Sequence, residues 1–253
     1  MGVWKLLKQR HNGSSNVDSV FLNSVFKEYD FLSEERNRLP TLFGVVYDGW
    51  ILYGLLQFLG SVAGAVGFRK VSGISKFLSY FSLAFFRNFK RAVPVAGKDA
   101  DGDVILSPAD GKVIAVEKVF DDYVGEAWRV KIFMSIFDCH VNRSVANAVL
   151  EKKVYRPGKF HAAYLKEADV NERLESCWRL ENGEKVKIAQ VAGQIARRID
   201  FRVEEGERVG VSEVFGMIKF SSRVDVVVSR RYRVLCKISD TVRAGDTILF
   251  RLV

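Results

Sequence analysis

Two adjacent serines, Ser221 and Ser222, lie within the stretch IKFSSRVD at 218–225, which otherwise has the pattern of a single β-strand. Apolar and polar residues alternate there, and the run VDVVV continues the strand signal. Serine packs poorly in a strand and competes with the ladder for backbone hydrogen bonds. A serine hydroxyl can also act as a nucleophile, but at neutral pH it needs a neighbouring base.

A candidate base lies in the segment MSIFDCHVNR at 134–143. If this segment is a strand, Asp138 and His140 share one side and Cys139 points to the other. That alternation excludes Cys139 as a nucleophile activated directly by His140, and it places a carboxylate beside an imidazole. The alternative is a surface histidine next to an aspartate, and the segment alone favours it.

A second carboxylate, Asp110, lies in the turn SPADG at 107–111. An aspartate in a Pro-x-Asp-Gly turn usually caps its own backbone, so this motif alone favours a structural role. The histidines are His11, His140 and His161, and no residue cluster has convincing metal-ligand spacing. The three cysteines form no CxxC pair, which argues for a reducing compartment.

The net charge of the chain indicates which kind of partner it binds. The 253 residues carry a net charge of +9, with 48% apolar and 27% charged residues, which favours nucleic acid or an anionic lipid surface. A recognition helix, a zinc finger and a stacking-aromatic signature are all missing from the sequence, so no nucleic-acid partner is expected.

The hydropathy supports a membrane surface. Residues 1–40 form a polar arm, and residues 41–95 are predicted to be a membrane-associated apolar segment. The run GWILYGLLQFLGSVAGAVGF at 49–68 has no charge and is long enough to cross a bilayer core, although Gln57 and five glycines weaken that reading. The run FLSYFSLAFF at 77–86 is too short to span, so we expect it to enter the interface.

Basic residues at 69, 70, 76, 87, 90 and 91 fit headgroup contacts on a cytoplasmic surface. The sequence therefore predicts a protein of the cell membrane, peripheral or shallowly inserted on its cytoplasmic face. The alternative is a buried helical hairpin in a soluble protein.

Residues 96–253 predict a mainly-β domain, a compact barrel or sandwich, because short β-branched runs are separated by Gly, Asp and Asn turns. ENGE at 181–184 is typical of a hairpin turn. One helix is expected at 160–175, where FHAAYLKEADVNERLE contains good helix formers.

Taken in order, the motifs LSPADGKV, MSIFDCHVNR, YRPGKFHAAYLKEADVNER, VAGQIARRI and GMIKFSSRVDVVV resemble the phosphatidylserine decarboxylases of the short bacterial and archaeal type. The preceding FFRNFKRAVP is similar to the family's FFR-x-P-x-R-x-x-P segment. The similarity covers about residues 77 to 253, roughly 70% of the chain.

The resemblance implies an inactive precursor that cuts its own backbone. The matching bond is Ser221–Ser222, which gives a large chain, 1–221, and a small chain, 222–253, that remain associated as a heterodimer. Ser222 becomes a covalent pyruvoyl group, and Asp110 and His140 form the relay that activates it. The pyruvoyl carbonyl then forms a Schiff base with phosphatidylserine, which loses CO2 to become phosphatidylethanolamine, and His140 is a candidate to return the proton.

Two positions depart from the family pattern. Ser221 stands where glycine is usual before the cut, and Arg143 stands where longer members carry a second histidine. The alternative function is a non-catalytic, membrane-attached, lipid-binding β-domain that has lost self-cleavage. A third reading keeps the chemistry but assigns an ether-linked phosphoserine lipid as the substrate.

Overall fold

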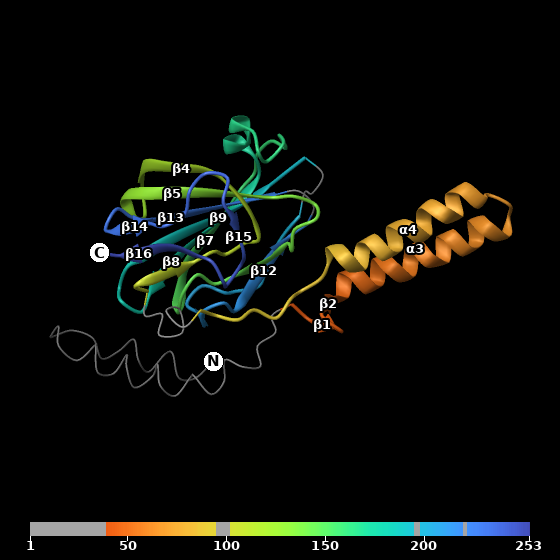
Figure 1. Cartoon of the computed structure of the whole chain (residues 1–253), viewed down its shortest axis with the longest axis horizontal. Coiled ribbons are helices and arrows are strands. Elements are labelled where there is room, and N and C mark those ends of the chain that lie inside the picture. Colours follow the sequence, from red (N-terminus) through yellow and green to blue (C-terminus); the bar gives the residue numbers. More distant parts are fainter. Residues whose placement is uncertain (1–38, 95–101, 195–197, 220–221) are drawn as a thin grey trace. The chain divides into compact units, whose positions relative to one another are not determined.

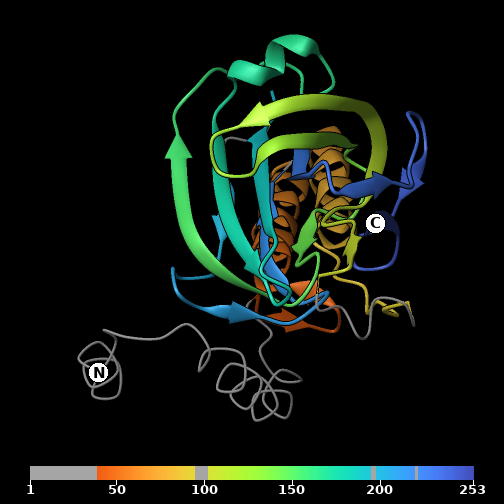
Figure 2. The ribbon, with the colours of Figure 1, turned by 90° about the vertical axis from the view of Figure 1, so that its left-hand side faces the viewer.

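The curled sheet of the C-terminal domain consists of antiparallel strands in the order β11-β7-β8-β9-β13-β5-β4-β15. A computed structural model describes residues 39–94, 102–194, 198–219 and 222–253. Figure 2 shows this sheet wrapping into a half-barrel. Its strands are β4 (Gly111–Asp121), β5 (Gly125–Met134), β7 (Ala148–Arg156), β8 (Arg173–Leu180), β9 (Lys185–Ala192), β11 (Arg208–Val209), β13 (Ser222–Ser229) and β15 (Thr241–Val242).

Three smaller sheets complete the described strands. One has the order β10-β12-β6, one β14-β16-β3, and the pair β1-β2 precedes the helices. Their bounds are β1 (Thr41–Leu42), β2 (Val45–Val46), β3 (Val104–Leu106), β6 (Val141–Arg143), β10 (Ile199–Phe201), β12 (Val214–Ile218), β14 (Tyr232–Val234) and β16 (Ile248–Leu252). The predicted mainly-β domain is therefore confirmed.

The main core lies on the concave side of the curled sheet. Inward-facing residues of β5, β9 and β13 are fully or almost fully buried there, and Trp178, Phe215 and Phe250 fill the space between the sheets. This alternation fixes which residues of β13 face the core, because a shift of one residue would turn every side chain to the other face.

Two helices precede the β-domain. They are α3 (Tyr47–Ala65) and α4 (Arg69–Phe85), which lie side by side in Figure 1. The second apolar run expected at 77–86 is thus the end of a longer helix that begins at Arg69. No helix among the described residues is long and apolar enough to cross a membrane. The polar arm expected at 1–40 lies almost entirely outside the described residues.

Two local predictions agree with the structure to different degrees. The ENGE turn does join β8 to β9, with Gly183 at a positive φ of 83°. The helix expected at 160–175 is wrong: only a 3-10 helix, η2 (Lys166–Val170), forms there. The side chain of Asn171 instead bonds to both backbone groups of His161 and to the carbonyl of Ala192, which holds the segment as a loop against the sheet.

Candidate active site

Ser222 begins strand β13, and this position corrects the expectation of one continuous strand over 218–225. Strand β12 ends at Ile218 in one sheet and β13 starts at Ser222 in another, so the chain changes sheets between them. Ser222 is fully buried and lies opposite Met134 of β5 and Ala192 of β9. Its hydroxyl donates to the Met134 sulfur at 3.5 Å, and a thioether is a weak acceptor. Ser221 lies outside the described residues.

The segment 134–143 is likewise not one strand. Strand β5 ends at Met134, a turn follows, and β6 begins at Val141. The Asp138 carboxylate accepts hydrogen bonds from the backbone N–H and hydroxyl of Ser135, so it closes the turn. Its charge acts to raise the pKa of His140, against the larger effect of burial. Cys139 donates its thiol to the carbonyl of Arg87.

His140 is fully buried, and its ring packs against that of Phe85 of α4, with the centroids 4.4 Å apart and the planes tilted by 38°. Its Nδ1 lies 2.9 Å from the carbonyl oxygen of Asp138. Because a carbonyl only accepts, Nδ1 must carry the proton, which leaves Nε2 with a free lone pair. Nε2 is buried and has no partner among the described residues. Burial lowers the pKa of His140 to about 4. The ring is therefore a neutral base at physiological pH.

Asp110 is held by other groups. Its carboxylate accepts from Arg91 at 2.6 Å and from the backbone N–H of Ala244 at 2.8 Å. The next residue, Gly111, lets the start of β4 pass close to β5, since a Cβ there would lie 2.2 Å from the carbonyl oxygen of Phe133. The structure does not bring Asp110 and His140 into a hydrogen bond, so the two predicted relay residues are not directly coupled in this state.

Arg143, at the position of the family's second histidine, lies near Asp110. Its guanidinium donates to the Ser212 carbonyl, the Asn88 side chain and the Phe89 carbonyl. Burial lowers its pKa, an effect that the charge of Asp110 partly offsets. Arg143 therefore ties the segment after α4 to the β-domain and cannot substitute for an imidazole as a base.

Two buried amides near Ser222 were missed by the sequence analysis. Gln190 donates its Nε2 to Asn142 Oδ1 at 2.7 Å, and Asn142 Nδ2 lies 3.9 Å from the same Met134 sulfur that Ser222 contacts. A signal was present in the strand KVKIAQVA, where Gln190 occupies an inward position of the alternation together with Val186 and Ile188.

An ion-pair cluster covers the opposite face of β13. Arg223 pairs with Asp225 and with Asp169 of η2, both at 2.7 Å, and Lys131 pairs with Asp169 at 3.0 Å. Burial alone would raise the pKa of Asp169, but Lys131 and Arg223 bring it below its ordinary value. The cluster fixes the loop before β8 onto the strand that Ser222 begins.

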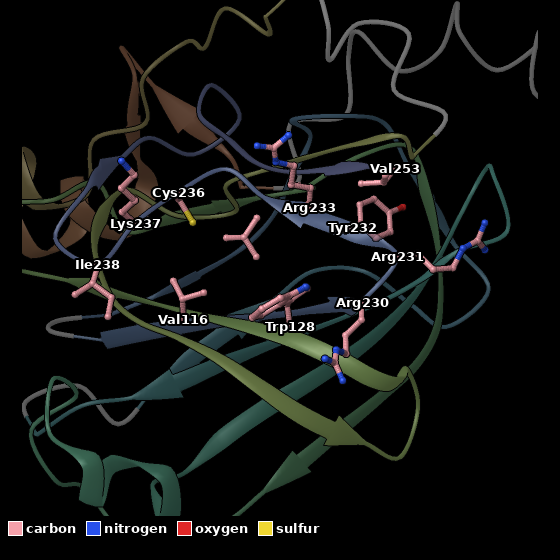
Figure 3. Close-up of a pocket in the computed structure, with 11 residues that line it drawn as sticks. Val116, Trp128, Arg230, Arg231, Tyr232, Arg233, Cys236, Lys237, Ile238 and Val253 are labelled. Atoms are coloured by element: carbon pink, nitrogen blue, oxygen red, sulfur yellow. The ribbon is translucent and has the colours of Figure 1, made fainter.

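A cavity of about 730 Å³ lies elsewhere, beside β14, and Figure 3 shows its lining. Val116, Trp128 and Ile238 supply apolar surface, and Arg233 and Lys237 supply charge. Ser222, His140 and Asp110 are not among its described lining residues. Among the described residues, no group of three or more His, Cys, Asp or Glu side chains is arranged to hold a metal ion.

A buried serine hydroxyl, an imidazole and two paired amides thus lie at or next to the ends of strands β13, β6 and β9. The family model for phosphatidylserine decarboxylase matches residues 78–250. The chain belongs to the phosphatidylserine decarboxylase family.

Individual relatives are similar in sequence to this protein over most of its length. The phosphatidylserine decarboxylase proenzyme of Desulfotalea psychrophila is 35% identical over 212 residues, which is 83% of this chain and 97% of that relative. The one from Nitratidesulfovibrio vulgaris is 37% identical over 216 residues, 85% of this chain and 97% of that relative. The one from Cupriavidus pinatubonensis is 39% identical over 178 residues, 69% and 80% of the two chains.

Proposed function

We propose that this chain is a self-processing decarboxylase that converts phosphatidylserine to phosphatidylethanolamine and CO2. Family membership supports the reaction, and the relatives' designation as proenzymes supports processing. The observation that carries the proposal is Ser222, a buried serine at the first position of a central strand, reached from a different sheet. Incubation of the purified protein with phosphatidylserine and detection of phosphatidylethanolamine test it directly.

The cut is proposed at Ser221–Ser222. The Ser222 hydroxyl oxygen bonds to the carbonyl carbon of Ser221 as the peptide C–N bond breaks and the nitrogen takes up a proton. Elimination then releases the carboxylate of chain 1–221 and leaves dehydroalanine, which water converts to a pyruvoyl group with loss of ammonia. Strand β12, which ends at Ile218, and strand β13, which begins at Ser222, belong to two sheets, so each of the two chains keeps its own strand pairing after the cut.

His140 is proposed as the base. Its Nε2 carries a free lone pair, and its carbonyl accepts from the N–H of Ile218, the last residue of the strand before the cut. General-base catalysis of this kind contributes about 10²–10⁴ in rate. Asp110 has a different proposed role: with Arg91 and Ala244 it fixes the turn before β4, whose backbone passes next to the end of β5.

The residues around Ser222 fit a pyruvoyl group at this position. Ser222 is fully buried, and the Met134 sulfur that it contacts is a thioether, which has no N–H that could form an imine with the group. When present, the group supplies an electron sink for decarboxylation. The chain's own residues exclude water, which favours conversion of a charged carboxylate into neutral CO2. His140 Nε2 takes up a proton from the substrate ammonium group and returns it in place of the lost carboxylate.

We propose further that helices α3 and α4 enter the cytoplasmic face of the cell membrane to a shallow depth. The seam between them is polar: Ser72, Ser75, Ser79 and Ser82 are buried there. Ser75 bonds to the Leu56 carbonyl at 2.6 Å. The outward faces are apolar and exposed, at Ile51, Leu55, Phe58, Leu59, Val62, Val71, Ile74 and Phe77.

This distribution is the reverse of that of a helical pair in water, where the apolar faces meet. Small and hydroxyl-bearing residues between helices are typical of pairs that lie in lipid. Burial of the exposed face in a bilayer would bring the β-domain to its substrate, which leaves the membrane only at a cost of about 0.8 kcal/mol per CH2. The net charge of +9 favours an anionic surface.

A further inference from the structure

Gln190 carries a buried carbonyl oxygen that has no hydrogen-bond partner among the described residues. The residue is fully buried on the inward face of β9. An unpaired buried acceptor costs about 1–3 kcal/mol, so a folded protein seldom keeps one without a use for it.

The direction of this carbonyl is fixed by a short chain of contacts. Asn142 Nδ2 lies 3.5 Å from the carbonyl oxygen of Pro108, which can only accept. Asn142 must therefore turn its Oδ1 the other way, where it accepts from Gln190 Nε2 at 2.7 Å. The amide nitrogen of Gln190 makes this hydrogen bond, and Oε1 lies on the other side of the amide group.

Gln190 is a close neighbour of Ser222. In the antiparallel pair β9–β13, Ser222 lies opposite Ala192 and Val224 lies opposite Gln190, so Gln190 and Ser222 are diagonal neighbours on one face. Such diagonal positions are about 7–8 Å apart, within reach of a long side chain. Asn142 and Met134 provide a second connection, because both Asn142 and Ser222 contact the Met134 sulfur.

We propose that Gln190 Oε1 accepts a hydrogen bond from the amino group of the substrate. This inference rests on the proposed function and assigns a further binding residue to the same site. The two buried, unpaired atoms here, Gln190 Oε1 and His140 Nε2, are both neutral acceptors. A ligand that engages Gln190 Oε1 must therefore present a donor, and a primary ammonium group meets that requirement. A quaternary ammonium, which has no N–H, does not.

The first test is Gln190→Met, which keeps the length of the side chain and removes its acceptor. The variant loses the unpaired oxygen of Gln190 but leaves Asn142 Oδ1 unpaired, so the number of unpaired buried acceptors is unchanged. Its melting temperature and its rate of self-cleavage should match those of the wild type. Its KM for phosphatidylserine should rise about tenfold to a hundredfold, as for the loss of a hydrogen bond to a charged group.

Ile188→Met is the matched control, since Ile188 lies two residues earlier on the same buried face of β9. A volume-conserving change there should leave KM as it is. The second readout uses mature proteins whose pyruvoyl carbonyl has been reduced with borohydride, so that no imine can form. It is their binding to micelles of a short-chain ethanolamine lipid or the corresponding choline lipid. The wild type should prefer the ethanolamine lipid, and Gln190→Met should lose that preference.

An unchanged KM in Gln190→Met, an equal rise in Ile188→Met, or slower self-cleavage together with a lower melting temperature would overturn the inference. So would a preference for the ethanolamine lipid that survives the substitution. A wild-type protein that neither cuts itself nor decarboxylates would overturn the proposed function and this inference together. A failure confined to the Gln190 variant leaves the proposed function standing.

Discussion

Ser222 and Met134 face each other across the β13–β5 ladder, and the serine hydroxyl donates to the methionine sulfur at 3.5 Å. The proposed nucleophile thus donates to a weak acceptor, while the Nε2 atom of His140 is buried and has no partner in the part of the chain that the structure describes. Maturation then requires the hydroxyl to leave sulfur and reach a base.

Met134→Leu removes the weak acceptor and nearly conserves volume, which should cost less than about 1.5 kcal/mol of stability. The freed hydroxyl should let the precursor decay at least as fast as the wild type does. The decay is followed on denaturing gels after synthesis in a cell-free system. A cleavage rate that falls tenfold in a stably folded variant would mean that the sulfur contact positions the hydroxyl for attack.

His140→Ala should slow precursor decay by about 10²–10⁴, because it removes the base. Asp110→Asn should slow it much less, because the contacts of Asp110 are to Arg91 and Ala244. Both are compared as time courses, since a single-turnover reaction completes even when slow. Cys139→Ala is the control, because its thiol is bonded to the Arg87 carbonyl. If the Asp110 and His140 variants lost the same factor in the rate of precursor decay, the two residues would act as a direct relay after all.

The depressed pKa of His140 gives stability a defined dependence on pH. Burial lowers its pKa from the ordinary 6.5 to about 4, so between these values the unfolded chain binds more protons than the folded one. The free energy of unfolding is therefore highest above pH 6.5. It falls by about 3 kcal/mol in total as the pH falls toward 4, because the unfolded chain takes up the proton first.

This dependence is measured in the uncut Ser222→Ala protein by denaturant unfolding at several pH values. Adding His140→Phe, which keeps a ring against Phe85, should flatten the profile between pH 6.5 and 4. A profile that keeps its slope in the double variant would assign the dependence to other groups.

The outward face of the helices gives a prediction for the membrane. Phe58 is 66% exposed on α3, and Phe120 is 78% exposed on the β-domain. Phe58→Glu should reduce co-sedimentation with anionic vesicles severalfold, whereas Phe120→Glu should bind as the wild type does. Equal binding of both variants would place the membrane contact elsewhere.

Much of the fold followed from local patterns, but the connections between elements did not. Alternation and turn residues predicted the β8–β9 hairpin, because both act within a few residues. The same alternation merged 218–225 into one strand, since a chain that changes sheets between Ile218 and Ser222 keeps its inward and outward pattern on both sides. The helix expected at 160–175 failed because Asn171 bonds to distant backbone groups, which outweighs weak local propensity.

In the candidate site, too, local motifs predicted single residues but not the contacts between distant ones. Ser222 and His140 were chosen as candidates from their motifs, and the structure shows that both are fully buried. The pairing of Asp110 with Arg91, and that of Gln190 with Asn142, join residues 19 and 48 positions apart, which no local pattern encodes.

The central claim is that this chain converts its own Ser222 into a pyruvoyl group. Intact-mass measurement of the purified protein tests it most directly, with Ser222→Ala as the uncut control. The account predicts two chains, 1–221 and 222–253, with the small chain lighter by one ammonia than a chain beginning with serine. A single uncut chain, or a small chain that begins with an unmodified serine, would contradict it.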